Sequence, residues 1–221
     1  MFIKSYKKTK CSFGCDLFND DSNYLYWEDR KVTNDEIEVV NYLNSLNNDK
    51  QFKILHIGIG NSYIAQNLNN YDSIHGISVA NNEIIFANKL KINNYKCFFL
   101  NKLSEGAFNN DLFNKYDFII DVNLKSYSCC NKAFCKMFNE YTKILNYNGS
   151  ILTGKKGMNW SRLLKPVYRF SFKKFFYKKL KEFDGPESNK LSIFECKNLA
   201  VNNGLKLEEI DGTNIVKFSK F

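Results

Sequence analysis

Short apolar runs alternate with segments of helical periodicity along most of the chain. Apolar residues recur every three or four positions in the helical segments, and continuous apolar runs of strand length lie between them. This alternation favours a mostly parallel sheet with helices on both faces. The predicted helices span 34–47, 62–68, 81–91, 133–145 and 191–202, and the predicted strands span 52–57, 73–77, 96–100, 118–120, 150–153, 205–210 and 213–218.

The two ends of this region carry sharper local signals. Thr33 and Glu36 have the spacing of a capping box, which marks the start of the first helix. Asp211-Gly212 between two strand-like runs is typical of a two-residue hairpin, so we expect the last strand to be antiparallel. No internal repeat or linker divides the chain. We therefore predict one α/β domain over 34–221, preceded by an N-terminal arm or lid over 1–33.

The composition suits a single domain with a substantial core. Of the 221 residues, 44% are hydrophobic and 25% are charged. The net charge of +9 reflects abundant lysine spread along the chain, so it does not by itself indicate a nucleic-acid partner. The first eight residues have no apolar run behind their charges, so we expect no signal peptide, and no run approaches the ~18 apolar residues of a membrane span. With seven cysteines, an odd number, we expect a cytoplasmic protein with reduced thiols.

The strongest motif for a ligand site is the run from Ile54 to Ser62. An apolar strand ends there in Gly58-x-Gly60, followed by a polar residue and a predicted helix. Glycines let the backbone turn sharply and approach a ligand, and a helix start offers unpaired N–H donors. We expect the turn residues Gly58, Ile59, Gly60 and Asn61 to contact a nucleotide cofactor.

The order of elements resembles that of the class I S-adenosylmethionine-dependent methyltransferases over residues 34–221. The strand and Gly-x-Gly at 54–62, the second strand at 74–80, the fourth strand at 116–121 and the helix–turn–strand at 144–152 match that family. The resemblance implies a Rossmann-like, seven-stranded, mostly parallel sheet with an antiparallel terminal hairpin strand. It also implies S-adenosylmethionine as cofactor and S-adenosylhomocysteine as product.

A nicotinamide-binding fold is the natural rival of this interpretation. The dinucleotide fingerprint needs a third glycine where this chain has Tyr63. The sheet of a nicotinamide-binding fold also does not end in an antiparallel hairpin, as we expect for this chain. Both features argue against it. The chain also departs from the methyltransferase pattern, since His56, Ser78 and Asn101 stand where that family usually has acidic residues. Neutral oxygens can still accept hydrogen bonds from the nucleoside, with less energy than carboxylates.

The resemblance assigns further residues to the cofactor and to the methyl acceptor. Asp121-Val122-Asn123-Leu124 lacks the Asn/Asp-Pro-Pro-aromatic motif of exocyclic-amine methyltransferases, and there is no Pro-Cys nucleophile. We therefore expect a small-molecule O, N or S nucleophile, with no identifiable general base. The implied cofactor contacts are Gly58, Ile59, Gly60, Asn61, Ser78, Val79, Asn101 and Asp121. The substrate contacts that we expect are Tyr24 and Trp27, from an arm that could close over the pocket, with Asn123, Tyr127, Lys155 and Trp160.

A basic aromatic insertion at about 155–190 leaves a second interpretation open. Its segment 155–181 holds ten Lys and Arg residues and no Asp or Glu, interleaved with aromatic residues. Such a surface could take RNA or another macromolecule as substrate, or be a helical cap with solvated lysines. A third interpretation is a non-catalytic binding protein with a degenerate cofactor site. No metal is expected, because the cysteine groups at 11–15 and 129–135 lie far apart and both histidines fall in predicted strands.

Overall fold

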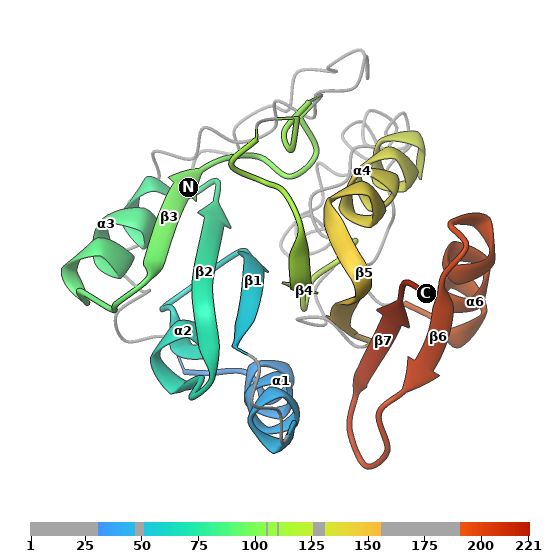
Figure 1. Ribbon diagram of the computed structural model, residues 1–221, viewed down its shortest axis with the longest axis horizontal. Helices are drawn as coiled ribbons and strands as arrows, with labels where there is room; N and C mark the ends of the chain where they lie inside the picture. Colours follow the sequence, from blue (N-terminus) through green and yellow to red (C-terminus); the bar gives the residue numbers. More distant parts are fainter. Residues whose placement is uncertain (1–30, 47–50, 105, 110, 126–130, 156–190) are drawn as a thin grey trace, which may run out of the picture.

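The computed structural model describes residues 31–46, 51–104, 106–109, 111–125, 131–155 and 191–221 (Figure 1). Nearly all of the predicted arm (1–33) and of the predicted insertion (155–190) falls outside these ranges, so both stay predictions. Within the described part, none of the helices is long and apolar enough to cross a membrane.

One mixed sheet of seven strands organises the described residues, in the order β3-β2-β1-β4-β5-β7-β6. The first five strands pair in parallel, and β7 is antiparallel to both of its neighbours. The predicted fold class is confirmed, including the reversed terminal strand. The strands are β1 (Phe52–Ile57), β2 (Tyr71–Ser78), β3 (Tyr95–Phe99), β4 (Tyr116–Ile120), β5 (Leu145–Gly154), β6 (Lys206–Glu209) and β7 (Ile215–Ser219).

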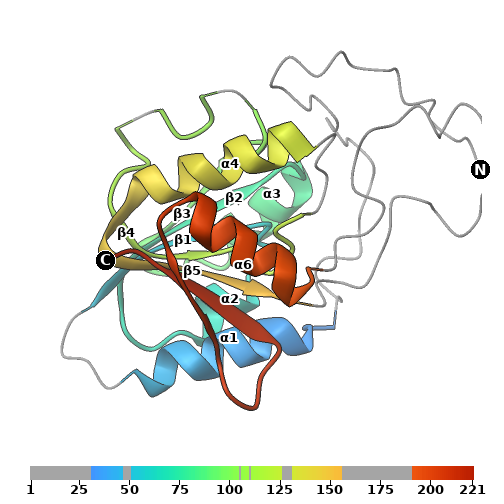
Figure 2. The same ribbon diagram turned by 90° about the vertical axis from the view of Figure 1, so that its right-hand side faces the viewer.

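Helices cover both faces of the sheet. In Figure 2, α4 and α6 lie over one face and α1 and α2 over the other. The strand residues alternate accordingly: in β1, Leu55 belongs to the core under α4 and α6, whereas Ile54 belongs to the core under α1 and α2. The helices are α1 (Asn34–Ser45), α2 (Tyr63–Asn67), α3 (Asn81–Lys89), α4 (Asn131–Ile144) and α6 (Ile193–Asn202).

The capping box that the sequence predicts is formed at the start of α1. The Thr33 backbone N–H donates to the Glu36 carboxylate at 2.8 Å, and the Glu36 backbone N–H donates to the Thr33 hydroxyl at 3.3 Å. The same reciprocal arrangement opens α6, between Ser192 and Glu195. Both helix starts therefore follow from local side-chain chemistry.

The predicted two-residue hairpin is wrong in its length. A hydrogen bond from the Ile210 N–H to the Ile215 carbonyl closes a loop of 211–214, so Thr213 and Asn214 belong to the turn. The reason is a tertiary contact with α1. Asn214 donates its backbone N–H to Glu38 at 2.7 Å and its side-chain amide to Asp35 at 2.8 Å. These bonds hold the turn against α1, while the Asn214 carbonyl accepts the Lys155 N–H at 2.9 Å.

The strand predicted over 150–153 is longer, since β5 begins directly after α4. Asn148 and Gly149, predicted to form a turn before the strand, lie within β5, and Asn148 has a left-handed φ of +64° there. A side chain at Gly149 would lie 2.8 Å from the Tyr116 carbonyl oxygen, so the two strands approach closely there. The register between β4 and β5 shifts at this point.

Candidate functional site

β1 ends in a turn whose backbone is left-handed at three of five residues. The φ angles are +70° at Gly58, +52° at Gly60 and +60° at Ser62. The Gly58 N–H still donates to the Ile77 carbonyl of β2 at 2.8 Å, and the Ser62 N–H closes the turn onto Ile59 at 2.7 Å. A side chain at Gly58 would meet nothing within 4 Å. That position therefore needs glycine for its conformation rather than for room.

Ile59 anchors the turn in the core. Its side chain is fully buried and packs with Ile84 and Ala87 of α3. A Cβ at Gly76 of β2 would lie 2.7 Å from Ile59 Cγ2 and 3.0 Å from the Tyr95 ring. The absent side chain of Gly76 thus leaves the space into which Ile59 and Tyr95 fit.

A buried carboxylate joins the turn to the next strand and helix. Glu83 Oε2 accepts the Gly60 N–H at 3.1 Å and the Ser78 hydroxyl at 2.6 Å. Ser78 Oγ in turn accepts the Ala80 N–H at 3.0 Å. Only 5% of the surface of Glu83 is exposed. Glu83 therefore places a carboxylate at the point where the glycine turn, the end of β2 and the first turn of α3 meet.

Sequence reasoning named Ser78 for this region and missed Glu83. An acidic residue in the first turn of a helix is usually explained by the helix dipole alone. The available signal was its spacing, since Glu83 lies four residues before the buried Ala87 and so on the inner side of α3. Only the packing of α3 against the turn shows that the side chain is buried.

A second buried cluster lies at the carboxyl end of β4. Lys102 Nζ donates to Asp121 Oδ2 at 2.8 Å and to the carbonyl oxygens of Asn123 at 3.0 Å and Leu124 at 3.2 Å. The Tyr141 hydroxyl of α4 donates to the same Asp121 oxygen at 3.0 Å. Lys102, which sequence reasoning also missed, thereby fixes the segment that follows β4.

Burial raises the pKa of two tyrosines, Tyr141 beside Asp121 and Tyr95 beside the glycine turn. It raises the pKa of Tyr141 well above its usual range, with the Asp121 carboxylate adding to the shift. It likewise raises the pKa of Tyr95, whose hydroxyl lies 3.1 Å from Ser62 Oγ. For Lys102, burial lowers the pKa and the neighbouring Asp121 opposes that shift. The tyrosines are therefore neutral hydrogen-bonding groups at physiological pH.

Two of the predicted cofactor residues make bonds within their own segments. Asp121 Oδ1 accepts the Asn123 N–H at 3.3 Å, while its other oxygen faces Lys102 and Tyr141. Asn101 Oδ1 accepts the Leu103 N–H at 3.0 Å. The assignment of Asp121 and Asn101 to the cofactor stays a prediction.

The remaining described residues of the prediction follow the ends of β1, β2 and β5. Asn61 completes the glycine turn, where its Oδ1 accepts the Tyr63 N–H at 3.3 Å, and Val79 follows directly after Ser78. Lys155 follows β5 and forms an ion pair with Glu209 of β6 at 2.5 Å. The predicted contacts after β1, β2 and β4 lie at the carboxyl ends of these strands, and Lys155 follows the carboxyl end of the parallel strand β5, with its ammonium paired to β6. Tyr24, Trp27, Tyr127 and Trp160 lie outside the described residues.

The helix after the glycine turn is shorter than predicted. α2 has five residues, and the Tyr63 N–H at its start already bonds the Asn61 side chain. One of the N–H donors expected at this helix start is therefore already used within the turn.

Both histidines are strand residues packed in the interior. His75 Nδ1 lies 2.6 Å from the Tyr116 hydroxyl, and the His56 side chain is fully buried in β1. Burial lowers the pKa of His75, and the charges of Lys53 and Lys96 lower it further. Within the described ranges, no group of three His, Cys, Asp or Glu residues could hold a metal ion.

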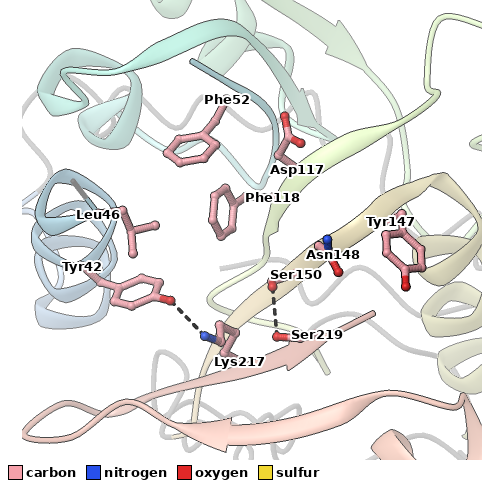
Figure 3. Close-up of a pocket in the computed structure, with 10 residues that line it drawn as sticks. All are labelled: Tyr42, Leu46, Phe52, Asp117, Phe118, Tyr147, Asn148, Ser150, Lys217 and Ser219. Carbon is pink, nitrogen blue, oxygen red and sulfur yellow. Dashed lines mark hydrogen bonds between the residues drawn. The ribbon is translucent and has the colours of Figure 1, made fainter. Parts of the chain in front are cut away.

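A hollow of about 390 Å³ opens at the opposite edge of the sheet (Figure 3). It is lined by the first residues of β1 and β4 together with residues of α1, β5 and β7. Lys217 donates there to the Tyr42 hydroxyl at 3.2 Å. Ligands of open α/β sheets bind at the carboxyl ends of the parallel strands. The hollow lies at their amino ends, so it is separate from the site at the glycine turn.

The strand order, the reversed β7 and the glycine turn after β1 define the class I methyltransferase fold. No family model matches the sequence, and no curated protein matches it. Magnesium protoporphyrin IX methyltransferase from Synechocystis, solved with bound S-adenosylmethionine, is 12% identical, with a TM-score of 0.59 over 96% of this chain and 100% of that chain. The N-methyltransferase NodS from Bradyrhizobium japonicum, solved with S-adenosylhomocysteine, is 12% identical, with a TM-score of 0.55 over 85% of this chain and 88% of that chain.

The fold also serves other chemistry. The cyclase SpnF is 14% identical, with a TM-score of 0.53 over 79% of this chain and 58% of that chain. At such identities the likeness establishes the fold, and function has to be argued from the site.

Proposed function

We propose that this protein is an S-adenosylmethionine-dependent methyltransferase. The observation that carries the proposal is the left-handed Gly58–Gly60 turn, bonded through Gly60 to the buried Glu83 carboxylate at the carboxyl ends of β1 and β2. The residues present suit a ligand made of a nucleoside joined to an amino acid. Open space lies beside Gly58, and Ser78 and Glu83 offer oxygen acceptors next to the turn.

Gly58, Ile59, Gly60 and Asn61 would hold the cofactor, with Ser78, Val79, Asn101 and Asp121 around it. S-adenosylmethionine supplies a methyl group that its sulfonium already activates. The chain then has to bind, align and shield the reactants, because alignment accounts for much of the rate of an in-line displacement. The Lys102–Asp121 pair contributes by holding the segment after β4 in one conformation.

The methyl acceptor that we propose is a small molecule with an O, N or S nucleophile. Support comes from Asp121-Val122-Asn123-Leu124, which lacks the motif for flipped nucleobases, and from a structural neighbour named for a porphyrin substrate. Asn123 and Lys155 are the described members of the proposed acceptor site. Tyr24, Trp27, Tyr127 and Trp160 complete it in this proposal.

The test is formation of S-adenosylhomocysteine from S-adenosylmethionine with separate panels of phenols, carboxylic acids, amines and thiols, and with total RNA. The proposal expects turnover with a member of a small-molecule panel and little dependence on salt. Turnover with RNA alone, falling steeply with salt, would instead support the macromolecular substrate. A chain that binds neither form of the cofactor would be a non-catalytic protein with this fold.

A further inference from the structure

We infer that Glu83 is the residue that binds the ribose hydroxyl groups of the cofactor, in place of an acidic side chain at the end of β2. This inference rests on the proposed function and goes beyond it, since it assigns the recognition of the ribose to α3. It makes Glu83 the main determinant of affinity on the nucleoside side of the site.

The placement of Glu83 along the chain fits this role. In nucleotide-binding α/β sheets, a carboxylate about 20 residues beyond the glycine turn accepts a hydrogen bond from the ribose. Residue 78, at the end of β2, is a serine here. Glu83 follows Gly60 by 23 residues and returns its carboxylate to within 3.1 Å of the Gly60 nitrogen. The helix thus delivers to the turn the chemical group that the strand end lacks.

The donors that Glu83 already accepts show what its carboxylate can bind. One is a backbone N–H of the glycine turn, and the other is the Ser78 hydroxyl at 2.6 Å. A ribose hydroxyl is the same kind of donor as the serine hydroxyl. A carboxylate held by such neutral donors keeps a strong, charge-assisted acceptor beside the turn backbone.

Ser78 offers a way to move the carboxylate without losing local structure. Its oxygen accepts the Ala80 N–H two residues on, a bond that an aspartate side chain also makes readily. Ser78→Asp would therefore keep this turn and present a carboxylate from β2. If the role of Glu83 is to supply a carboxylate here, that change should compensate for its loss.

The experiment is calorimetric titration of S-adenosylhomocysteine into the wild type, Glu83→Gln and Ser78→Asp/Glu83→Gln. The amide oxygen of Gln can still accept the Gly60 N–H, so the single variant mainly removes the charge. We expect affinity about 10- to 100-fold weaker in Glu83→Gln, the range for one charge-assisted bond, and substantial recovery in the double variant. Glu208→Gln, which removes the charge of an exposed carboxylate paired with Lys217 on β6 and β7, is the matched control and should bind as the wild type.

A 2′,3′-dideoxy analogue of S-adenosylhomocysteine separates hydroxyl binding from support of the turn. The wild type should lose about the same factor with the analogue as Glu83→Gln loses with the parent ligand, and Glu83→Gln should bind both ligands alike. If the wild type binds both alike, the inference is overturned, even where the variants fold poorly. If the wild type binds neither ligand, the proposed function fails and the inference with it. If Glu83→Gln binds S-adenosylhomocysteine as tightly as the wild type does, the inference alone is overturned.

Discussion

The Lys102 ammonium lies 2.8 Å from an Asp121 carboxylate oxygen, and both side chains are buried. The pair connects the segment after β3 to the segment after β4. Lys102 also donates to two backbone carbonyls of that second segment. This one side chain therefore sets the backbone path beside the proposed acceptor site.

Asp121→Asn should strongly destabilise the protein, because it leaves the Lys102 charge buried without its anion. We expect the free energy of unfolding in urea to fall by about 3–5 kcal/mol. Lys102→Met should also be costly, and the double variant should lose less than the sum of the two. Strictly additive losses would show that the two side chains are not energetically coupled.

Acid should weaken the fold through His75. Its pKa is lowered in the folded protein by burial and by Lys53 and Lys96, so the unfolded chain binds a proton at higher pH. Stability that is full above about pH 6.5 should then be lost as the pH falls through the folded pKa. Urea titrations between pH 7 and pH 5 check this, since His75→Gln should show a shallower decline. Equal slopes in the two proteins would rule out this contribution of His75.

Gly58→Ala should impair cofactor binding through backbone conformation. An alanine at a φ of +70° costs about 1–2 kcal/mol, or the turn rearranges to avoid it. We expect at least about tenfold weaker binding of S-adenosylhomocysteine, the factor that 1.4 kcal/mol gives. Gly204→Ala is the matched control, because it has a φ of +61°, open space for a side chain and a position after α6. Equal loss of binding in both variants would argue against a specific role of the turn.

Gly76→Ala should disturb the same turn through its contact with the buried Ile59 side chain. Its new methyl group would lie 2.7 Å from Ile59 Cγ2, so Ile59 or the strand has to move. We expect lower thermal stability and weaker S-adenosylhomocysteine binding. Ile59→Ala removes the clashing carbon and should restore part of both in the double variant, whereas Ile59→Val keeps a branched Cβ and should not. No difference between these double variants would contradict the packing described.

Much of the fold follows from local patterns in the sequence. Apolar patterns located most of the described helices and strands to within a few residues, because residues such as Leu55 and Ile54 of β1 are buried in the cores on the two faces of the sheet. The hairpin was predicted at the correct place and with the wrong length. Within the longer loop, Asn214 bonds Asp35 and Glu38 of α1, contacts between distant parts of the chain that a local pattern does not reveal.

The site was less predictable than the fold. Gly58 and Gly60 are visible in the sequence because a backbone requirement restricts the residue type. Glu83 and Lys102 are not, since each lies in a segment where a charged side chain is ordinary. Their partners, Ser78 and Asp121, were expected to act directly on a ligand. The structure shows them bonded to these two buried charges.

Whether the turn after β1 holds S-adenosylmethionine can be measured by calorimetric titration of S-adenosylhomocysteine into the full chain, with no need to know the methyl acceptor. We expect saturable binding at one site per chain, with a dissociation constant of about 1 μM to 1 mM, the range of typical KM values. No detectable binding at millimolar ligand would contradict it.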